Sequence, residues 1–159
     1  MSLFIQFLTW FRIISAPVIF LLITFFHMYG WALILFLLAS SSDYWDGFLA
    51  RKYNLESVVG AVLDPVADKI LVSFLILALT LELTSIFIGL IGGIILFREF
   101  WVGALRDLNA RSGSLDATKV TMLAKIKTAT QFVTFASFIL GLFLNNALIL
   151  FLSNFFLFC

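Results

Sequence analysis

Charge, cysteine and histidine are all scarce in this sequence. Of its 159 residues, 12% are charged and 63% are hydrophobic, and cysteine and histidine occur once each. A soluble domain of this length needs a far more polar surface, so the composition indicates an integral membrane protein. The single cysteine, Cys159, excludes an internal disulfide bond and a cysteine-based metal site. The net charge of +1 gives no indication of nucleic-acid binding.

Long apolar stretches fill most of the chain. A helix needs about 20 mostly apolar residues to cross a membrane. Six stretches qualify, the last of them short, and they run over residues 10–29, 31–50, 60–81, 86–105, 122–143 and 146–159. The chain has no internal repeat and no linker, so we expect a single membrane-embedded domain over residues 1–159. The predicted fold class is all-α with six transmembrane helices, preceded by a short interfacial helix at residues 2–9.

The basic residues indicate how the chain is oriented. With a cytoplasmic N-terminus, all ten Lys and Arg fall in cytoplasmic loops or in the cytoplasmic halves of spans. The opposite turns, at residues 27–31, 82–85 and 144–147, contain none. Basic residues concentrate on the cytoplasmic side of membrane proteins, so the N-terminus is predicted to be cytoplasmic. A bacterial inner membrane is the expected location.

Four aspartates lie near the predicted cytoplasmic ends of the second and third spans. Asp43, Asp46 and Gly47 share one helix face, and Asp64 and Asp68 share a face of the next helix. Because consecutive spans run antiparallel, we expect both faces to border one polar cleft on the cytoplasmic side. Four carboxylates would repel one another without a cation, and an oxygen-only ligand set favours Mg²⁺ or Mn²⁺. Two such ions could share these carboxylates, as in two-metal sites that act on phosphoryl groups.

Two interpretations compete with a catalytic metal site. The aspartates could simply pair in the headgroup region with Arg51, Lys52 and Lys69. They could also form the permeation site of a divalent-cation transporter, but such a site is expected deep in the membrane. Here the carboxylates lie at one membrane edge beside Arg51, which would repel a permeating cation. A purely structural membrane subunit would leave two helix-spaced acidic pairs unexplained.

The spacing of these residues resembles the signature of the CDP-alcohol phosphatidyltransferase family. The matching positions are Asp43, Asp46, Gly47, Ala50, Arg51, Gly60, Asp64 and Asp68. The resemblance implies the fold of that family and transfer of a phosphatidyl group from CDP-diacylglycerol to an alcohol, with release of CMP.

The resemblance also implies a role for each residue. Asp43 and Asp64 would bridge two metal ions, Asp46 would complete one metal site, and Asp68 would complete the other. Asp68 would in addition be the general base for the attacking hydroxyl. Contacts to the CDP moiety would come from Gly47, Ala50, Arg51, Ser57 and Gly60.

The second half of the chain bears on the acceptor alcohol. The segments FREFWVGALRD and LAKIKTATQF resemble the phosphatidylglycerophosphate synthase branch of the family. The opening segment FLTWFRIISAPVIF is similar to the start of that branch, with Thr9 and Arg12 matching. The resemblance implies glycerol 3-phosphate as the acceptor. The nearest alternatives are the acceptors of phosphatidylserine synthase or of a CDP-dependent cardiolipin synthase.

Basic residues of the fourth and fifth spans agree with an acceptor that carries its own phosphate. They converge on the predicted cytoplasmic mouth from two helices, and they are Arg98, Arg106, Lys125 and Lys127. Arg and Lys bind phosphate strongly, although they could instead contact anionic lipid headgroups. We expect Arg98, deep in an apolar run, to pair with Glu99 or with a substrate phosphate. Gly89 and Gly93 are expected to pack within the chain, with a homodimer contact as the alternative.

Overall fold

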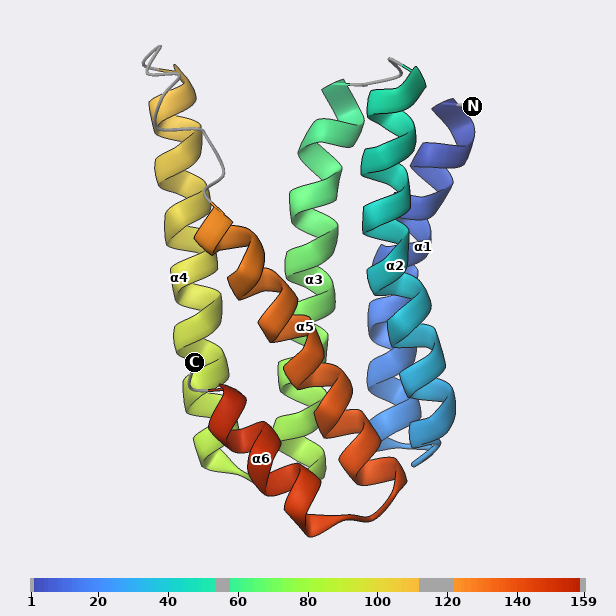
Figure 1. Ribbon diagram of the computed structural model, residues 1–159, viewed down its shortest axis with the longest axis vertical. Helices are drawn as coiled ribbons and strands as arrows, with labels where there is room; N and C mark the ends of the chain where they lie inside the picture. The colour runs from blue at the N-terminus through green and yellow to red at the C-terminus, as the bar shows by residue number, and fades with distance from the viewer. Residues whose placement is uncertain (1, 54–57, 112–121, 158–159) are drawn as a thin grey trace.

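Six helices make up the part of the chain that the computed structural model describes, which is residues 2–53, 58–111 and 122–157 (Figure 1). They are α1 (Ser2–Thr24), α2 (Tyr29–Tyr53), α3 (Val58–Glu82), α4 (Ile86–Arg111), α5 (Met122–Phe143) and α6 (Ala147–Leu157). The regular structure in these ranges is helical throughout, which confirms the all-α prediction. One expectation is wrong: residues 2–9 belong to the continuous helix α1 and do not form a separate helix.

Three of the helices are long and apolar enough to cross a membrane. Their apolar windows are Phe7–Thr24, Ile86–Leu105 and Ile126–Phe143. Two further apolar segments are shorter, Tyr29–Ser42 and Ala147–Leu157. The 11 residues of α6 rise about 16 Å, roughly half of a hydrocarbon core of about 30 Å. The helices therefore indicate an integral membrane protein, and the number of six spans remains a prediction.

Three tight turns lie at the same end of the helices, at the bottom of Figure 1. Each contains a residue with a positive φ of 45–50°, and these residues are His27, Thr84 and Asn145. The Ser85 N–H donates to Thr80 O at 3.2 Å, and the Asn146 N–H donates to Gly141 O at 3.0 Å. Bonds of this type satisfy the last carbonyls of a helix and let the chain reverse. The second and third turns fall where the sequence predicted breaks between spans. The first falls earlier than predicted, because α1 ends at Thr24 and Gly30 lies inside α2.

Side chains also join two of these turns. Tyr29 Oη donates a hydrogen bond to Glu82 Oε1 at 2.5 Å, and His27 Nδ1 lies 3.2 Å from the same oxygen. The turn between α1 and α2 is thereby tied to the end of α3. His27, the only histidine in the sequence, thus has a carboxylate partner in the neighbouring turn.

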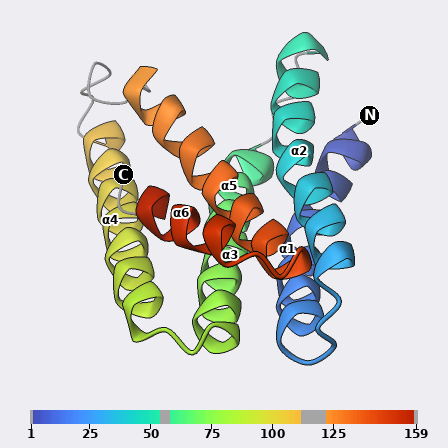
Figure 2. The same cartoon turned by 60° about the horizontal axis from the view of Figure 1, so that its bottom comes forward.

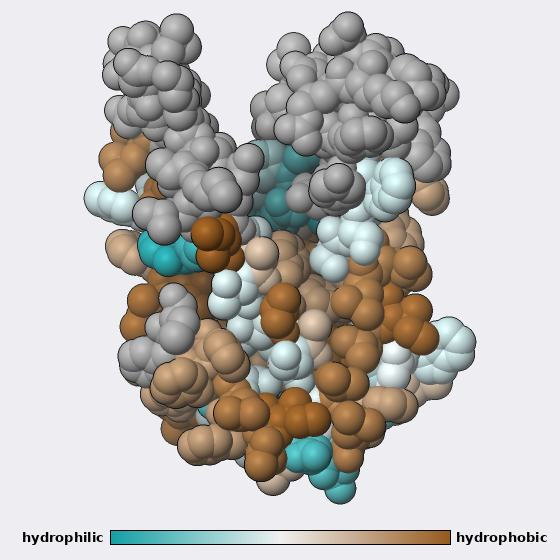
Figure 3. Space-filling model, viewed as in Figure 1, coloured by the Kyte–Doolittle hydropathy of each residue, from teal (hydrophilic) through white to brown (hydrophobic). Residues whose placement is uncertain are grey.

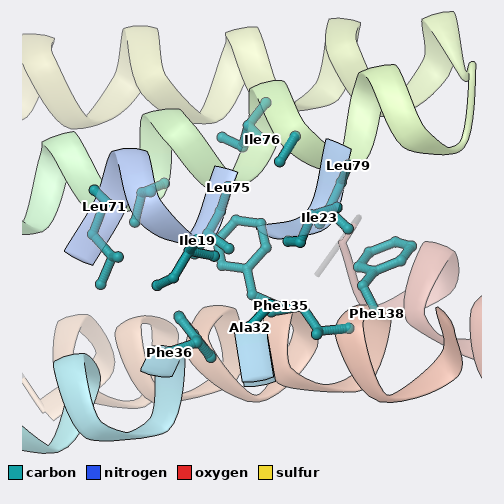
Figure 4. Close-up of a cluster of buried hydrophobic side chains, with 14 of the residues drawn as sticks. Ile19, Ile23, Ala32, Phe36, Leu71, Leu75, Ile76, Leu79, Phe135 and Phe138 are labelled. Atoms are coloured by element: carbon teal, nitrogen blue, oxygen red, sulfur yellow. The ribbon is translucent and has the colours of Figure 1, made fainter. Parts of the chain in front are cut away.

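The core lies where α1, α2, α3 and α5 meet (Figure 4). Ile19 and Ile23 of α1 face Leu75 and Leu79 of α3, and Phe135 reaches toward them from α5. These side chains have almost no exposed surface, so tight apolar packing fixes the spacing of the helices. Outward-facing positions are apolar as well, and hydrophobic residues cover most of the middle of the face drawn in Figure 3.

The remaining helices lie outside this core. α4 packs against α3, and α6 packs against α5, beside whose lower half it lies in Figure 1; Figure 2 shows α6 turning away from that end of α5. A Cβ added at Gly92 would overlap Cγ2 of Ile76 on α3, whereas one added at Gly93 would meet nothing within 4 Å. Gly89 packs internally against Thr80, as expected. The expected internal contact of Gly93 is wrong, because Gly92 occupies the helix face that meets α3.

Candidate active site

Asp64 and Asp68 lie one helical turn apart within the first three turns of α3. Both are half-buried, and the side chain of Asp68 is 36% exposed. The spacing of four residues places them on one face of the helix, as the sequence predicted. Each carboxylate receives a contact from α1, the helix that packs most extensively on α3.

The first contact joins Thr9 to Asp64. Thr9 Oγ1 donates a hydrogen bond to Asp64 Oδ1 at 2.8 Å. Thr9 is almost completely buried, with 2% exposure. The bond therefore holds the carboxylate from its inner side.

The second contact is an ion pair between Arg12 and Asp68. Arg12 Nη1 donates to Asp68 Oδ1 at 2.7 Å, and the Arg12 side chain is 0% exposed. A guanidinium remains charged under all ordinary conditions, so its burial requires an anionic partner. The position of the aspartates on α3 thus explains how α1 tolerates an arginine in an apolar run.

The contacts of Thr9 and Arg12 were not predicted from the sequence. Both residues matched a family pattern, but no contact with the aspartates was assigned to them. A usable signal was present in Arg12 itself, because a charge within an apolar span needs a carboxylate partner on another helix. The identity of that partner depends on how α1 and α3 pack.

Lys69 points away from the two aspartates. Its Nζ lies 4.9 Å from the centre of the Phe100 ring on α4, a cation–π distance. A Cβ added at Gly103 would lie 2.7 Å from the same nitrogen. Lys69 thus packs on α4, which counts against its pairing with the aspartates.

A second polar group joins α4 to α5. Glu99 accepts a hydrogen bond from Arg98 Nη2 at 3.2 Å and also contacts the ammonium of Lys127. The expected pairing of Arg98 with Glu99 is confirmed. Two cations share a single carboxylate here, so the group carries a net positive charge that suits an anionic ligand.

Arg98 and Lys127 also line a cavity of about 520 Å³ between α4, α5 and α6. Its walls are mostly apolar, and its remaining polar residues are Thr130, Gln131 and Thr134. The buried Nε2 of Gln131 makes no hydrogen bond within the described part of the chain. The volume lies in the range of small-molecule sites, and the polar groups gather along its α5 wall.

Several predicted site residues cannot be compared with the structure. Ser57 lies outside the described residues. For the other residues of this group the backbone is described but the side chain is not, and they are Asp43, Asp46, Gly47, Ala50, Arg51, Gly60, Arg106 and Lys125. Among the side chains that the structure does describe, no three His, Cys, Asp or Glu residues gather as a metal site. The joint arrangement of the four aspartates therefore stays a prediction.

The sequence profile of the CDP-alcohol phosphatidyltransferases matches residues 5–158, nearly the whole chain. The chain belongs to this family. The match extends from α1 to α6, so it includes the helices that carry Thr9 and Arg12 as well as those that carry the aspartates.

Relatives within the family are similar over most of their length. The chain is 37% identical over 133 residues to a protein of Salmonella choleraesuis (strain SC-B67), a match that covers 81% of this chain and 72% of the relative. It is 36% identical, over the same shares, to a protein of Escherichia coli (strain K12). Both relatives are named CDP-diacylglycerol–glycerol-3-phosphate 3-phosphatidyltransferase.

Members of the CDP-alcohol phosphatidyltransferase family generally depend on a divalent metal ion. The described residues fit such an ion by their chemistry. Asp64 and Asp68 supply carboxylate oxygens from one helix face, and both are partly accessible. Hard divalent cations prefer oxygen ligands of this kind.

Proposed function

We propose that this phosphatidyltransferase transfers the phosphatidyl group of CDP-diacylglycerol to glycerol 3-phosphate, giving phosphatidylglycerol phosphate and CMP. The supporting observation is the 36–37% identity, over 81% of the chain, to enzymes named for that reaction. The net positive group at Arg98 and Lys127 agrees with an acceptor that carries a phosphate.

In the proposed site, Asp43, Asp46, Asp64 and Asp68 hold two Mg²⁺ ions. Bound divalent ions would neutralise the pyrophosphate charge and make the acceptor hydroxyl more acidic. Asp43 and Asp64 would each contact both ions, and Asp46 and Asp68 would each contact one. The hydrogen bonds of Asp64 and Asp68 with α1 support a site at these two carboxylates, because they hold both on one face of α3.

The remaining residues bind and orient the substrates. The CDP moiety is assigned to Gly47, Ala50, Arg51, Ser57 and Gly60. The phosphate of the acceptor is assigned to Arg98, Arg106, Lys125 and Lys127. In the transfer step the acceptor hydroxyl oxygen attacks the phosphatidyl phosphorus, the bond to the CMP oxygen breaks, and CMP leaves with the electron pair. The hydroxyl proton passes to the carboxylate of Asp68, the general base.

The proposed site faces the cytoplasm of a bacterial cell, with the N-terminus on the same side of the inner membrane. The three described turns hold no Lys or Arg, and they lie at the helix ends away from Asp64 and Asp68. The lipid substrate can then reach the site through the bilayer, and glycerol 3-phosphate can reach it from the cytoplasm. The outer face of α4 is the proposed homodimer contact, because a Cβ added at Gly93 would meet nothing within 4 Å in the described part of the chain.

The reaction can be tested with purified protein, CDP-diacylglycerol, Mg²⁺ and a panel of acceptors, by following CMP release. We expect release with glycerol 3-phosphate, and loss of release when EDTA removes the metal. The Asp68→Asn variant should be at least about 100-fold slower, as expected for loss of a general base. No CMP with any acceptor would contradict the proposed reaction, and release with serine or phosphatidylglycerol alone would contradict the assigned acceptor.

A further inference from the structure

Two residues of α1 contact two residues of α3 in matching register. Thr9 and Arg12 are three residues apart, and Asp64 and Asp68 are four residues apart, so each pair spans one helical turn. The bonds of 2.8 Å to Asp64 and 2.7 Å to Asp68 therefore form two successive links between the same helices.

Burial differs sharply between the donors and the acceptors. Thr9 and Arg12 are 2% and 0% exposed, whereas the side chain of Asp68 is 36% exposed and Asp64 is also partly accessible. The donors thus lie inside the helix bundle, and the carboxylates lie between them and the surface. Such a bond fixes the orientation of a carboxylate from its buried side.

Packing alone does not account for this arrangement. Ile19 and Ile23 of α1 already pack against Leu75 and Leu79 of α3, further along the same pair of helices. Burying a guanidinium costs several kcal/mol of desolvation, and apolar side chains of similar size often stabilise such a position better. A buried arginine and a buried hydroxyl, each placed opposite a carboxylate, point to a role for those carboxylates.

We propose that Thr9 and Arg12 are positioning residues that preorganise Asp64 and Asp68 for a divalent cation. This inference rests on the proposed function, because it takes the two aspartates as metal ligands. Each contact holds one carboxylate oxygen, Oδ1, and thereby sets the direction in which the whole group faces. The cation then meets carboxylates that are already oriented, and less side-chain freedom is lost when it binds.

The two contacts affect metal binding through different physical terms. Thr9 is neutral, so its hydrogen bond acts only on orientation. Arg12 orients Asp68, offsets part of the repulsion between carboxylates, and also repels the metal itself. Substitutions that leave the charge unchanged are therefore the informative ones. Partners of metal ligands typically contribute 10–100-fold to metal affinity.

The test measures Mn²⁺ affinity of the purified full-length protein without substrates, by electron paramagnetic resonance of the free ion. Thr9→Val removes the hydroxyl at constant size, and Arg12→Lys keeps the charge but loses the planar donor group. Thr9→Ser keeps the hydroxyl. Ser15→Ala is the matched control, because Ser15 is buried on the same helix but donates to Phe11 O within α1 at 2.6 Å.

We expect Thr9→Val and Arg12→Lys to weaken Mn²⁺ binding about 10-fold or more, with Thr9→Ser and Ser15→Ala within twofold of the unchanged protein. An affinity within twofold in either folded test variant would overturn the inference, as would absence of Mn²⁺ binding by the unchanged protein. If Arg12→Lys does not fold, the comparison of Thr9→Val with Thr9→Ser decides. If the protein binds Mn²⁺ but releases no CMP with any acceptor, the proposed reaction is refuted. The roles of Thr9 and Arg12 are still decided by the Mn²⁺ affinities of the variants.

Discussion

Glu99 links α4 and α5 through ion pairs with two cations. It contacts Arg98 on its own helix and Lys127 on α5, and both cations line the cavity beside it. One carboxylate cannot neutralise two cations, so a positive charge remains for a ligand. Arg98 and Lys127, two of the residues assigned to the acceptor phosphate from the sequence, thus belong to one polar group.

Substitution of Lys127 tests this assignment. Lys127→Gln removes the charge at nearly constant length and leaves Arg98 paired with Glu99. Loss of one charge-assisted hydrogen bond to phosphate, worth about 1.5–3 kcal/mol, should raise the KM for glycerol 3-phosphate roughly 10-fold or more. The KM for CDP-diacylglycerol should change less than about twofold. Steady-state kinetics of CMP release, with each substrate varied in turn, measures both constants.

The control for this substitution is Lys127→Arg, which keeps the positive charge and should retain most of the acceptor affinity. Two outcomes for Lys127→Gln would place Lys127 outside the acceptor site. One is an equal rise of the KM values for both substrates, and the other is an unchanged KM for glycerol 3-phosphate.

At the scale of elements, α4 meets α3 along a row of glycines. Each glycine of this row faces a side chain of α3, and the contacts are Gly89 with Thr80, Gly92 with Ile76 and Gly103 with Lys69. Small residues allow helix backbones to approach closely, which is a major source of helix association within membranes. The attachment of α4, and with it the position of Arg98, depends on this row.

Two neighbouring glycines provide a matched test of the α3–α4 contact. Gly92→Ala places a methyl group against Ile76, and overpacking of this kind costs about 1–3 kcal/mol. Gly93→Ala adds the same methyl group where, apart from the local backbone of α4, no described atom lies within 4 Å. Both changes gain the same helix propensity, so their difference isolates the packing term. We expect Gly92→Ala to unfold several degrees below Gly93→Ala in detergent, at about 2–4 °C per kcal/mol.

Thermal unfolding followed by circular dichroism would make this comparison. Equal melting temperatures for the two variants would show that α4 does not depend on close contact at Gly92. A lower temperature for Gly93→Ala would mean that its outer face packs against another surface, such as a second copy of the chain.

At the scale of the whole molecule, the helix ends differ in charge. The described turns at His27, Thr84 and Asn145 lie at one end, and the sequence has no Lys or Arg in them. All ten Lys and Arg of the sequence lie outside these turns. This asymmetry is the physical basis for predicting that the uncharged turns face away from the cytoplasm.

Cysteine labelling tests the predicted orientation. In a Cys159→Ser background, Phe25→Cys and Leu144→Cys place thiols at exposed positions of two turns. We expect a membrane-impermeant maleimide to label both in intact spheroplasts. Ser114→Cys, between α4 and α5, should be labelled only after the membrane is permeabilised. The reverse pattern would show that the N-terminus and the proposed site face the other side.

The sequence by itself determined the helical class, the positions of two of the three turns, the family and the residue types of the candidate site. These are properties along the chain, because the length of apolar runs and the fixed spacing of a motif do not depend on packing. It also placed Asp64 and Asp68 on one helix face, since their spacing of four residues suffices for that.

Only the tertiary structure decided which side chains meet across helices. It joined Thr9 to Asp64 and Arg12 to Asp68, and it brought Gly92 rather than Gly93 against α3. Helices of a membrane protein are apolar around most of their circumference, so the sequence does not show which face turns inward. That rotation is set by close packing between helices, and it decides which polar groups become partners.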